Sequence, residues 1–316
     1  MPRASASGFH GWCRKVPALS IEHAGMTIKD IISYAMEASL FALVMSIGLQ
    51  SRWSDVVHVL RRPALLLRAI IAVNVIVPVV AISLCLVLPI APWTKAGLVM
   101  MAVSPGAPFA PLKMLKGGAE RSYVVGVYVA LMLAAILIVP VTAALLKPIA
   151  PRGVMVPVPL VAAFVIETVF LPLVAGLLVH SWNEALGQRA APIMRKAALL
   201  ILLPAVVLIF IRFSRDFLGL IGDGSLLVIA ASVAAGLAAG FILGGPDVAS
   251  RNALGEAAST RHPGLAAAIS QLQSNDTRVL AAIVLYLFAS MAFSAAYARF
   301  VSAGIRSLRT ADLSHQ

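Results

Sequence analysis

The chain has 316 residues, of which 60% are hydrophobic and 12% charged, with a mean hydropathy of +0.95. Water-soluble domains carry about a quarter charged residues, so this composition excludes a soluble globular protein and predicts an all-α integral membrane protein. The net charge of +12 does not indicate a nucleic-acid partner, because lysines and arginines are scattered through short segments between apolar spans, as the positive-inside rule expects.

Residues 1–26 form a polar N-terminal segment that has no acid before Glu22. A secretory signal requires an apolar central run, which this segment lacks, so we expect a disordered tail. Its composition is also compatible with a transit peptide, and Met26 is an alternative start. Only Cys13 and Cys85 are present, so we expect no disulfide framework, no metal site and no cofactor.

Nine apolar spans follow in a membrane domain at residues 27–304, and a basic cytoplasmic tail is expected at 305–316. Each span is about 20 residues long, which is the length that a helix needs to cross a bilayer. The seventh span contains Gly236 and Gly240, a spacing that lets two helices approach closely. The predicted helices cover 28–50, 64–90, 94–116, 122–147, 154–180, 193–211, 225–245, 249–273 and 278–301.

The third span contains a run that cannot continue as a regular helix. Pro105, Pro108 and Pro111 recur at three-residue spacing, and Gly106 follows the first of them. A proline costs about 3 kcal/mol in a helix interior, because it removes a hydrogen-bond donor and obstructs the preceding turn. We therefore expect non-helical backbone at 105–108.

The eighth span combines three ionisable residues with a second break. Glu256, Arg261 and His262 precede Pro263 and Gly264 inside an otherwise apolar stretch. An arginine at bilayer depth costs about 2.5–3.5 kcal/mol on insertion scales, so it faces a partner or a wet cavity. We expect non-helical backbone at 262–264, where protein or water must satisfy the freed backbone groups.

The two Pro-Gly pairs lie in spans of opposite orientation, each followed by one long apolar helix. Broken helices at corresponding places in inverted halves mark the midplane binding site of many secondary transporters. The sequence thus predicts an inverted repeat with two broken helices that cross.

Lysines and arginines also predict the orientation. With nine spans, the loops after the first, third, fifth and seventh share a side with the C-terminus, and these loops hold most of the positive charge. The positive-inside rule therefore places the C-terminus in the cytoplasm and the N-terminus outside, in a bacterial inner membrane.

These motifs resemble the bile acid:sodium symporter family. The likeness rests on the first break, on Lys116-Gly117-Gly118, and on Arg251 leading into Pro263-Gly264-Leu265-Ala266. It implies two domains, a panel at 28–50 and 154–211 and a core at 64–148 and 225–301. It also implies transport of an organic anion.

The sodium-site positions of that family are not matched here. Where sodium-coupled members carry Ser-Asn after the first break, this chain has Ala110 and Pro111. Where they carry Glu and then Gln-Asn before the second break, it has Ala257, then Arg261 and His262. Sodium sites built of hard oxygen ligands therefore do not carry over residue by residue.

Several candidate residues keep two interpretations. Arg261 either joins helices through carbonyls or attracts an anion, and His262 either caps carbonyls or titrates near neutral pH. Glu256 is either a solvated acid at a helix start or a site residue. Glu37 and Glu167, in the predicted panel, either face the cavity or pair with a basic residue. Asn74 either joins helices or binds a ligand. The candidate binding residues are Arg261, His262, Glu256, Ser259, Thr260, Ser104, Asn74, Glu37 and Glu167.

We expect a secondary transporter for a small organic anion that does not use sodium and is either passive or proton-coupled. The first alternative is a sodium-coupled symporter of the bile-acid type. The second is a membrane-embedded enzyme that uses Glu256 and His262 as an acid–base pair, although no nucleophile motif accompanies them. Besides the bilayer and protons, the sequence indicates no further partner and leaves the oligomeric state open.

Overall fold

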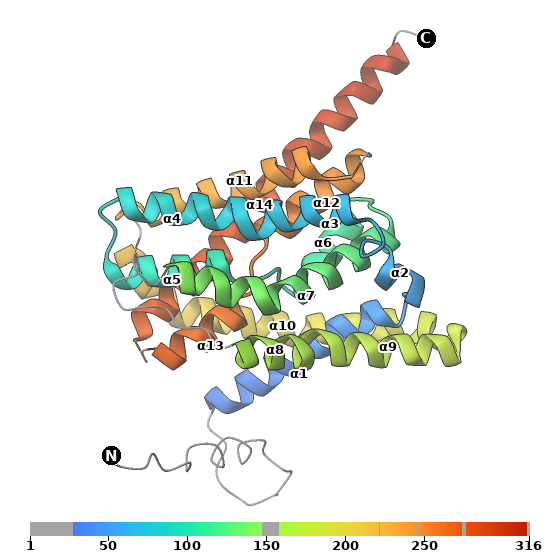
Figure 1. Ribbon diagram of the computed structural model, residues 1–316, viewed down its shortest axis with the longest axis horizontal. Helices are drawn as coiled ribbons and strands as arrows, with labels where there is room; N and C mark the ends of the chain where they lie inside the picture. Colours follow the sequence, from blue (N-terminus) through green and yellow to red (C-terminus); the bar gives the residue numbers. More distant parts are fainter. Residues whose placement is uncertain (1–27, 147–157, 221, 246, 274–275, 315–316) are drawn as a thin grey trace, which may run out of the picture.

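The computed structural model describes residues 28–146, 158–220, 222–245, 247–273 and 276–314, and every regular element among them is a helix (Figure 1). The predicted disordered tail at 1–26 lies outside the described residues. The elements are α1 (Ile28–Gly48), α2 (Trp53–Val57), α3 (Pro63–Ile70), the π-helix η1 (Ile71–Ile76), α4 (Val77–Val87), α5 (Pro92–Val103), α6 (Ala110–Lys116), α7 (Arg121–Leu146), α8 (Val158–Val165), the π-helix η2 (Ile166–Phe170), α9 (Leu171–Trp182), α10 (Glu184–Leu220), α11 (Ser225–Leu243), α12 (Val248–Ser259), α13 (Pro263–Gln273) and α14 (Thr277–Ser314).

Six of the described helices are long and apolar enough to cross a membrane. They are Pro63–Val87, Arg121–Thr142, Val161–Trp182, Glu184–Phe217, Ser225–Leu243 and Thr277–Tyr297. The other three predicted spans coincide with a shorter apolar helix at Tyr34–Gly48 and with the two interrupted pairs, α5 with α6 and α12 with α13. The number nine stays a prediction.

Two predicted boundaries are wrong. We expected the sixth helix at 193–211, but α10 begins at Glu184, and a single residue separates it from α9. Asn183 accepts a hydrogen bond from the Leu186 N–H at 3.0 Å, so a cap replaces the expected loop. The last helix was expected to end at 301, yet α14 continues through the predicted tail to Ser314.

The helices lie in layers (Figure 1). On one side α1 packs against α9 and α10, and on the other α11 packs against α12 and α4. The α11–α12 contact confirms the close approach that the two glycines predict, since a Cβ placed on Gly240 would lie 2.2 Å from the Gly255 backbone nitrogen. The halves of the two interrupted helices pack in two apolar clusters. Helices α5 and α13 belong to one cluster, and α6 and α12 belong to the other.

Candidate functional site

The two interrupted helices meet through short extended segments. Helix α5 ends at Val103 and α6 begins at Ala110, while α12 ends at Ser259 and α13 begins at Pro263. Gly106 pairs with Arg261 in an antiparallel bridge. Such a pairing matters inside a membrane because the ends of a broken helix leave backbone groups unbonded, and lipid cannot satisfy them.

Backbone and side-chain bonds join the two segments. The His262 N–H donates to the Pro105 carbonyl at 2.8 Å, and the Ala107 N–H donates to the Thr260 carbonyl at 3.4 Å. The Ser104 hydroxyl donates to the His262 carbonyl at 2.7 Å. Each segment therefore supplies partners for the backbone that the other exposes, and we call this arrangement the crossing.

The second break lies two residues earlier than the sequence predicts. We expected non-helical backbone at 262–264, but it covers 260–262, and Pro263 is the first residue of α13. Proline suits that position, because its missing N–H would be unbonded there and its fixed φ matches a helix. The first break covers 104–109, with Pro108 in its turn and Pro111 in the first turn of α6.

Arg261 is buried at the crossing, with 1% of its surface exposed. Its guanidinium donates to the Ser104 carbonyl at 3.0 Å and to the Val73 carbonyl of η1 at 2.6 Å, and it lies beside Tyr286. No carboxylate of a described residue lies within ion-pair distance of it, and its Nε has no hydrogen-bond partner. Arg261 thus joins three chain segments while its charge stays without a counter-ion.

The Val73 carbonyl is free to accept this bond because of a π-helix. In a π-helix each carbonyl accepts from the residue five positions ahead. Five positions after Val73 stands Pro78, which has no N–H. The guanidinium of Arg261 replaces the missing donor, so the proline in α4 and the arginine at the crossing form one arrangement.

His262 points away from Arg261, because neighbouring side chains of an extended segment lie on opposite faces. Its ring packs edge-on against Phe164 of α8, with the ring centroids 4.9 Å apart. Its Nδ1 accepts from the Leu265 N–H at 3.4 Å, while Nε2 is buried without a partner. Of the two residues, His262 is therefore the one that faces α8.

Glu256 lies in the last turn of α12, so its interpretation as a solvated acid at a helix start is wrong. Its carboxylate pairs with the Lys113 ammonium of α6 at 2.9 Å and accepts from the Ser294 hydroxyl of α14 at 2.6 Å. Lys113 also donates to Ser294 at 2.7 Å and to the Thr260 hydroxyl at 3.3 Å. We call these four residues the lysine cluster.

The other candidates divide by burial. Ser259 is buried and donates to the Glu256 carbonyl at 3.2 Å, while Asn74 lies buried in η1 with its Nδ2 unpartnered. Glu37 of α1 and Glu167 of η2 are exposed, and neither joins an ion pair with a described residue. The structure therefore brings the two serines and Thr260 to the crossing, places Asn74 next to Val73 in η1, and leaves both glutamates exposed.

The proposed acid–base pair gains no support. The Glu256 carboxylate is held by Lys113 and Ser294, whereas the His262 ring packs against Phe164. No hydrogen bond joins the two side chains in the described part of the chain, and no group of three or more His, Cys, Asp or Glu side chains that could hold a metal ion occurs there.

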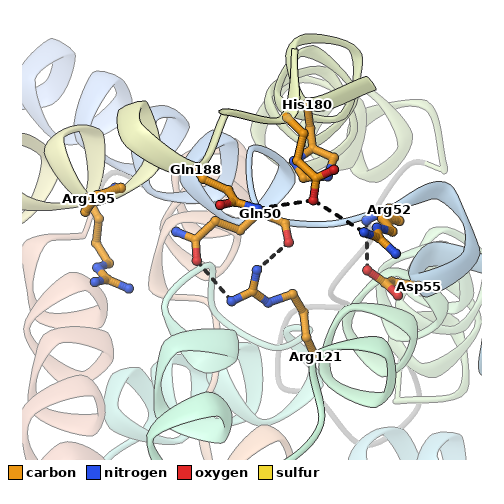
Figure 2. Close-up of a pocket in the computed structure, with 9 residues that line it drawn as sticks. Gln50, Arg52, Asp55, Arg121, His180, Gln188 and Arg195 are labelled. Atoms are coloured by element: carbon orange, nitrogen blue, oxygen red, sulfur yellow. Dashed lines mark hydrogen bonds and ion pairs between the residues drawn. The ribbon is translucent and has the colours of Figure 1, made fainter. Parts of the chain in front are cut away.

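A polar cavity of about 620 Å³ lies away from the crossing, where α1, α2, α7, α9 and α10 meet (Figure 2). Arg121 donates both to the Gln50 carbonyl and, at 3.0 Å, to its side-chain oxygen. Arg195 reaches the same space from α10. The lining residues are Gln50, Arg52, Asp55, Arg121, His180, Glu184, Gln188, Pro192 and Arg195.

The cavity keeps an excess of positive charge. Glu184 pairs with Arg52 at 3.3 Å and accepts from Gln188 at 3.1 Å, and Asp55 accepts from the Arg52 backbone N–H at 2.8 Å. Neither Arg121 nor Arg195 has a carboxylate within ion-pair distance among the described residues. Two guanidinium groups on different helices thus bring positive charge to the cavity without an acidic partner among the described residues.

Neither Lys113 nor the cavity residues were among the functional residues predicted from the sequence. Lys113, Arg52, Arg121 and Arg195 contributed only to the count of positive charge on one side. The signal that was available for Lys113 is a lysine three residues inside the end of an apolar span, together with an acid in the second broken span. Pairing these two opposite charges would have predicted their contact.

Comparison with families of known proteins finds a match. The model of the family described as "Sodium Bile acid symporter family" matches residues 38–218, which is more than half of the chain. The matched region begins in α1 and ends in α10, so it includes the first break and the cavity but not the second break. A search of curated proteins finds no match.

Proposed function

Because the chain belongs to the sodium bile acid symporter family, which is a family of membrane transporters, we propose that it moves a small organic anion by alternating access. In this proposal α1 and α8–α10 form a panel, and α3–α7 with α11–α14 form a core that rocks against it. We further propose that transport does not use sodium, that the membrane is a bacterial inner membrane, and that the C-terminus is cytoplasmic.

The observation that carries sodium independence is the buried guanidinium of Arg261. A buried charge is tolerated only with hydrogen bonds or counter-charge, and this one is bonded to the carbonyls of Val73 and Ser104. A bound metal cation would satisfy the same carbonyl oxygens. Because the arginine is covalently attached and always protonated, it supports the crossing without binding or releasing an ion. A fixed cation cannot draw energy from a sodium gradient.

Positive charge supports an anionic substrate. Among the described residues, Arg261, Arg121 and Arg195 have no carboxylate within ion-pair distance, and the last two line the cavity between proposed panel and core helices. A cavity with a net excess of one sign of charge raises the local concentration of the opposite ion. In our proposal an organic anion passes this cavity at the cytoplasmic end.

His262 is the residue that we propose as the contact between the crossing and the substrate path. Its ring lies against Phe164 of the proposed panel, and its Nε2 has no partner. An imidazole both binds an anion and carries a proton, so His262 would serve either passive or proton-coupled transport. Glu256 is less suited to this role, because Lys113 and Ser294 hold its carboxylate.

Uptake into proteoliposomes tests the proposal. We expect a labelled bile acid or a labelled small carboxylate to accumulate with saturation kinetics and to be recovered chemically unchanged, with no accumulation in protein-free liposomes. Chemical conversion of the label by detergent-solubilised protein, without any accumulation, would instead support a membrane-embedded enzyme.

A further inference from the structure

The ammonium group of Lys113 is surrounded by oxygen atoms from three different parts of the fold. It lies 2.9 Å from a Glu256 carboxylate oxygen of α12, 2.7 Å from the Ser294 hydroxyl of α14 and 3.3 Å from the Thr260 hydroxyl at the crossing. An ammonium group has three donors, and here three oxygens accept them. The set consists of one charged and two neutral oxygens.

This arrangement differs from the surface ion pairs of the same chain. The side chains of Lys113 and Glu256 are 28% and 12% exposed, whereas those of Arg52 and Glu184 are 69% and 53% exposed. In addition, the Ser294 hydroxyl donates to the Glu256 carboxylate at 2.6 Å while it accepts from the ammonium. The Ser294 hydroxyl and the Glu256 carboxylate therefore orient each other independently of the cation.

Carboxylate and hydroxyl oxygens are also the ligands that hard metal cations prefer. We propose that Glu256, Thr260 and Ser294 form a binding site for one monovalent cation, and that the ammonium of Lys113 is its built-in occupant. This inference rests on the proposed function, in which Arg261 takes the place of one free cation at the crossing. Lys113 would take the place of a second.

The built-in occupant connects elements that the crossing alone does not join. Lys113 belongs to α6, the half-helix after the first break, and its partners belong to α12, to the second break and to α14. Removing its charge leaves Glu256 half-buried without a counter-ion, which is costly. The vacated site then requires a cation from solution.

Lys113→Ala is the variant that opens the site, because it removes the ammonium and most of the stem while Glu256, Thr260 and Ser294 stay. Purified full-length protein is melted in the chlorides of sodium, potassium, ammonium, propylammonium and choline at equal ionic strength. We expect a melting temperature several degrees below wild type in choline, and recovery of about 3 °C or more in at least one of the small cations.

Three further variants make the result specific. Lys113→Met loses the charge but keeps the stem, so it should be destabilised without recovery by any cation. Lys113→Ala combined with Glu256→Gln should lose the recovery, since the anionic ligand is gone. Lys116→Ala removes an equal charge from the exposed end of α6 and should behave as wild type in all five salts.

Each outcome has a separate meaning. If Lys113→Ala folds but melts identically in all five salts, the inference is overturned while sodium-independent transport stands. If it does not fold in any salt, the same melting series is run on Lys113→Ser. No rise in its melting temperature in sodium, potassium or ammonium also overturns the inference. If wild type itself is stabilised by sodium over potassium, the proposed function fails first.

Discussion

Arg261 holds the crossing through bonds to backbone rather than to an acid. Its two carbonyl partners lie on different elements, Val73 in η1 and Ser104 at the end of α5. The planar, forked guanidinium reaches both at once, whereas an ammonium on a flexible stem is a point charge. The geometry of this side chain, and not only its charge, is therefore required.

Arg261→Lys should reduce uptake by about tenfold or more, because losing one charge-assisted hydrogen bond costs about 1.5–3 kcal/mol. The measurement is the initial rate of labelled-anion uptake in proteoliposomes at equal protein content. Arg189→Lys, at an exposed position of α10, is the matched control and should transport normally. Normal uptake by Arg261→Lys would show that charge alone suffices.

The two glycines of the Pro-Gly pairs are not equivalent. A Cβ on Gly264 would lie 3.1 Å from Cε1 and 3.3 Å from Nδ1 of His262, so the ring must move against Phe164. A Cβ on Gly106 would meet nothing closer than 3.7 Å. We expect Gly264→Ala to lower uptake several-fold and Gly106→Ala to leave it nearly unchanged, with both variants folded by thermal melting. The reverse order would place the sensitive contact at the first break.

At the scale of elements, two π-helices shape the helices around the site, and each lies just before a proline. In η2 the Leu171 N–H donates to the Ile166 carbonyl, which is the spacing of five that defines the element. Five positions after Glu167 stands Pro172, as Pro78 follows Val73 in the first case. A proline inside a membrane helix is thus accommodated by a wider turn, and one such turn frees the carbonyl that Arg261 uses.

The two Pro-Gly pairs were enough to predict that both helices are interrupted, because the backbone N–H that a proline lacks is a local property of the sequence. The position of the second gap was missed by two residues, since a proline ends one helix as readily as it begins the next. Neither π-helix was predicted, because a single proline does not reveal whether a turn kinks or widens. The contact between Lys113 and Glu256 was also missed, because it depends on the packing of α6 against α12 and the two opposite charges were not considered as a pair.

Close packing of α11 on α12 sets the position of α12, which is the half-helix before the second break. Gly240→Ala would place a Cβ 2.2 Å from the Gly255 nitrogen and 2.3 Å from its Cα, and backbone cannot yield as a side chain can. We expect a loss of about 1–3 kcal/mol in unfolding free energy or a failure to express. Gly219→Ala, where a Cβ meets nothing within 4 Å, is the control and should be at least as stable as wild type. Equal stability of the two variants would contradict the packing.

At the scale of the whole molecule, the charged groups occupy two places with separate tasks. Arg261 and the lysine cluster lie at the crossing, where their bonds join segments distant in sequence. Arg121 and Arg195 line the cavity between α1, α7 and α10, and no carboxylate in the described part of the chain lies within ion-pair distance of them. In the proposed mechanism the first group replaces bound cations and the second attracts the anion.

The central claim is that fixed side-chain cations take the place of transported sodium. The most direct measurement is uptake of a labelled bile acid into proteoliposomes in which external sodium is replaced by potassium at constant osmolarity, repeated at several pH values. We expect equal initial rates in the two salts, with any stimulation following the proton gradient. Uptake that requires sodium and vanishes in potassium would contradict it.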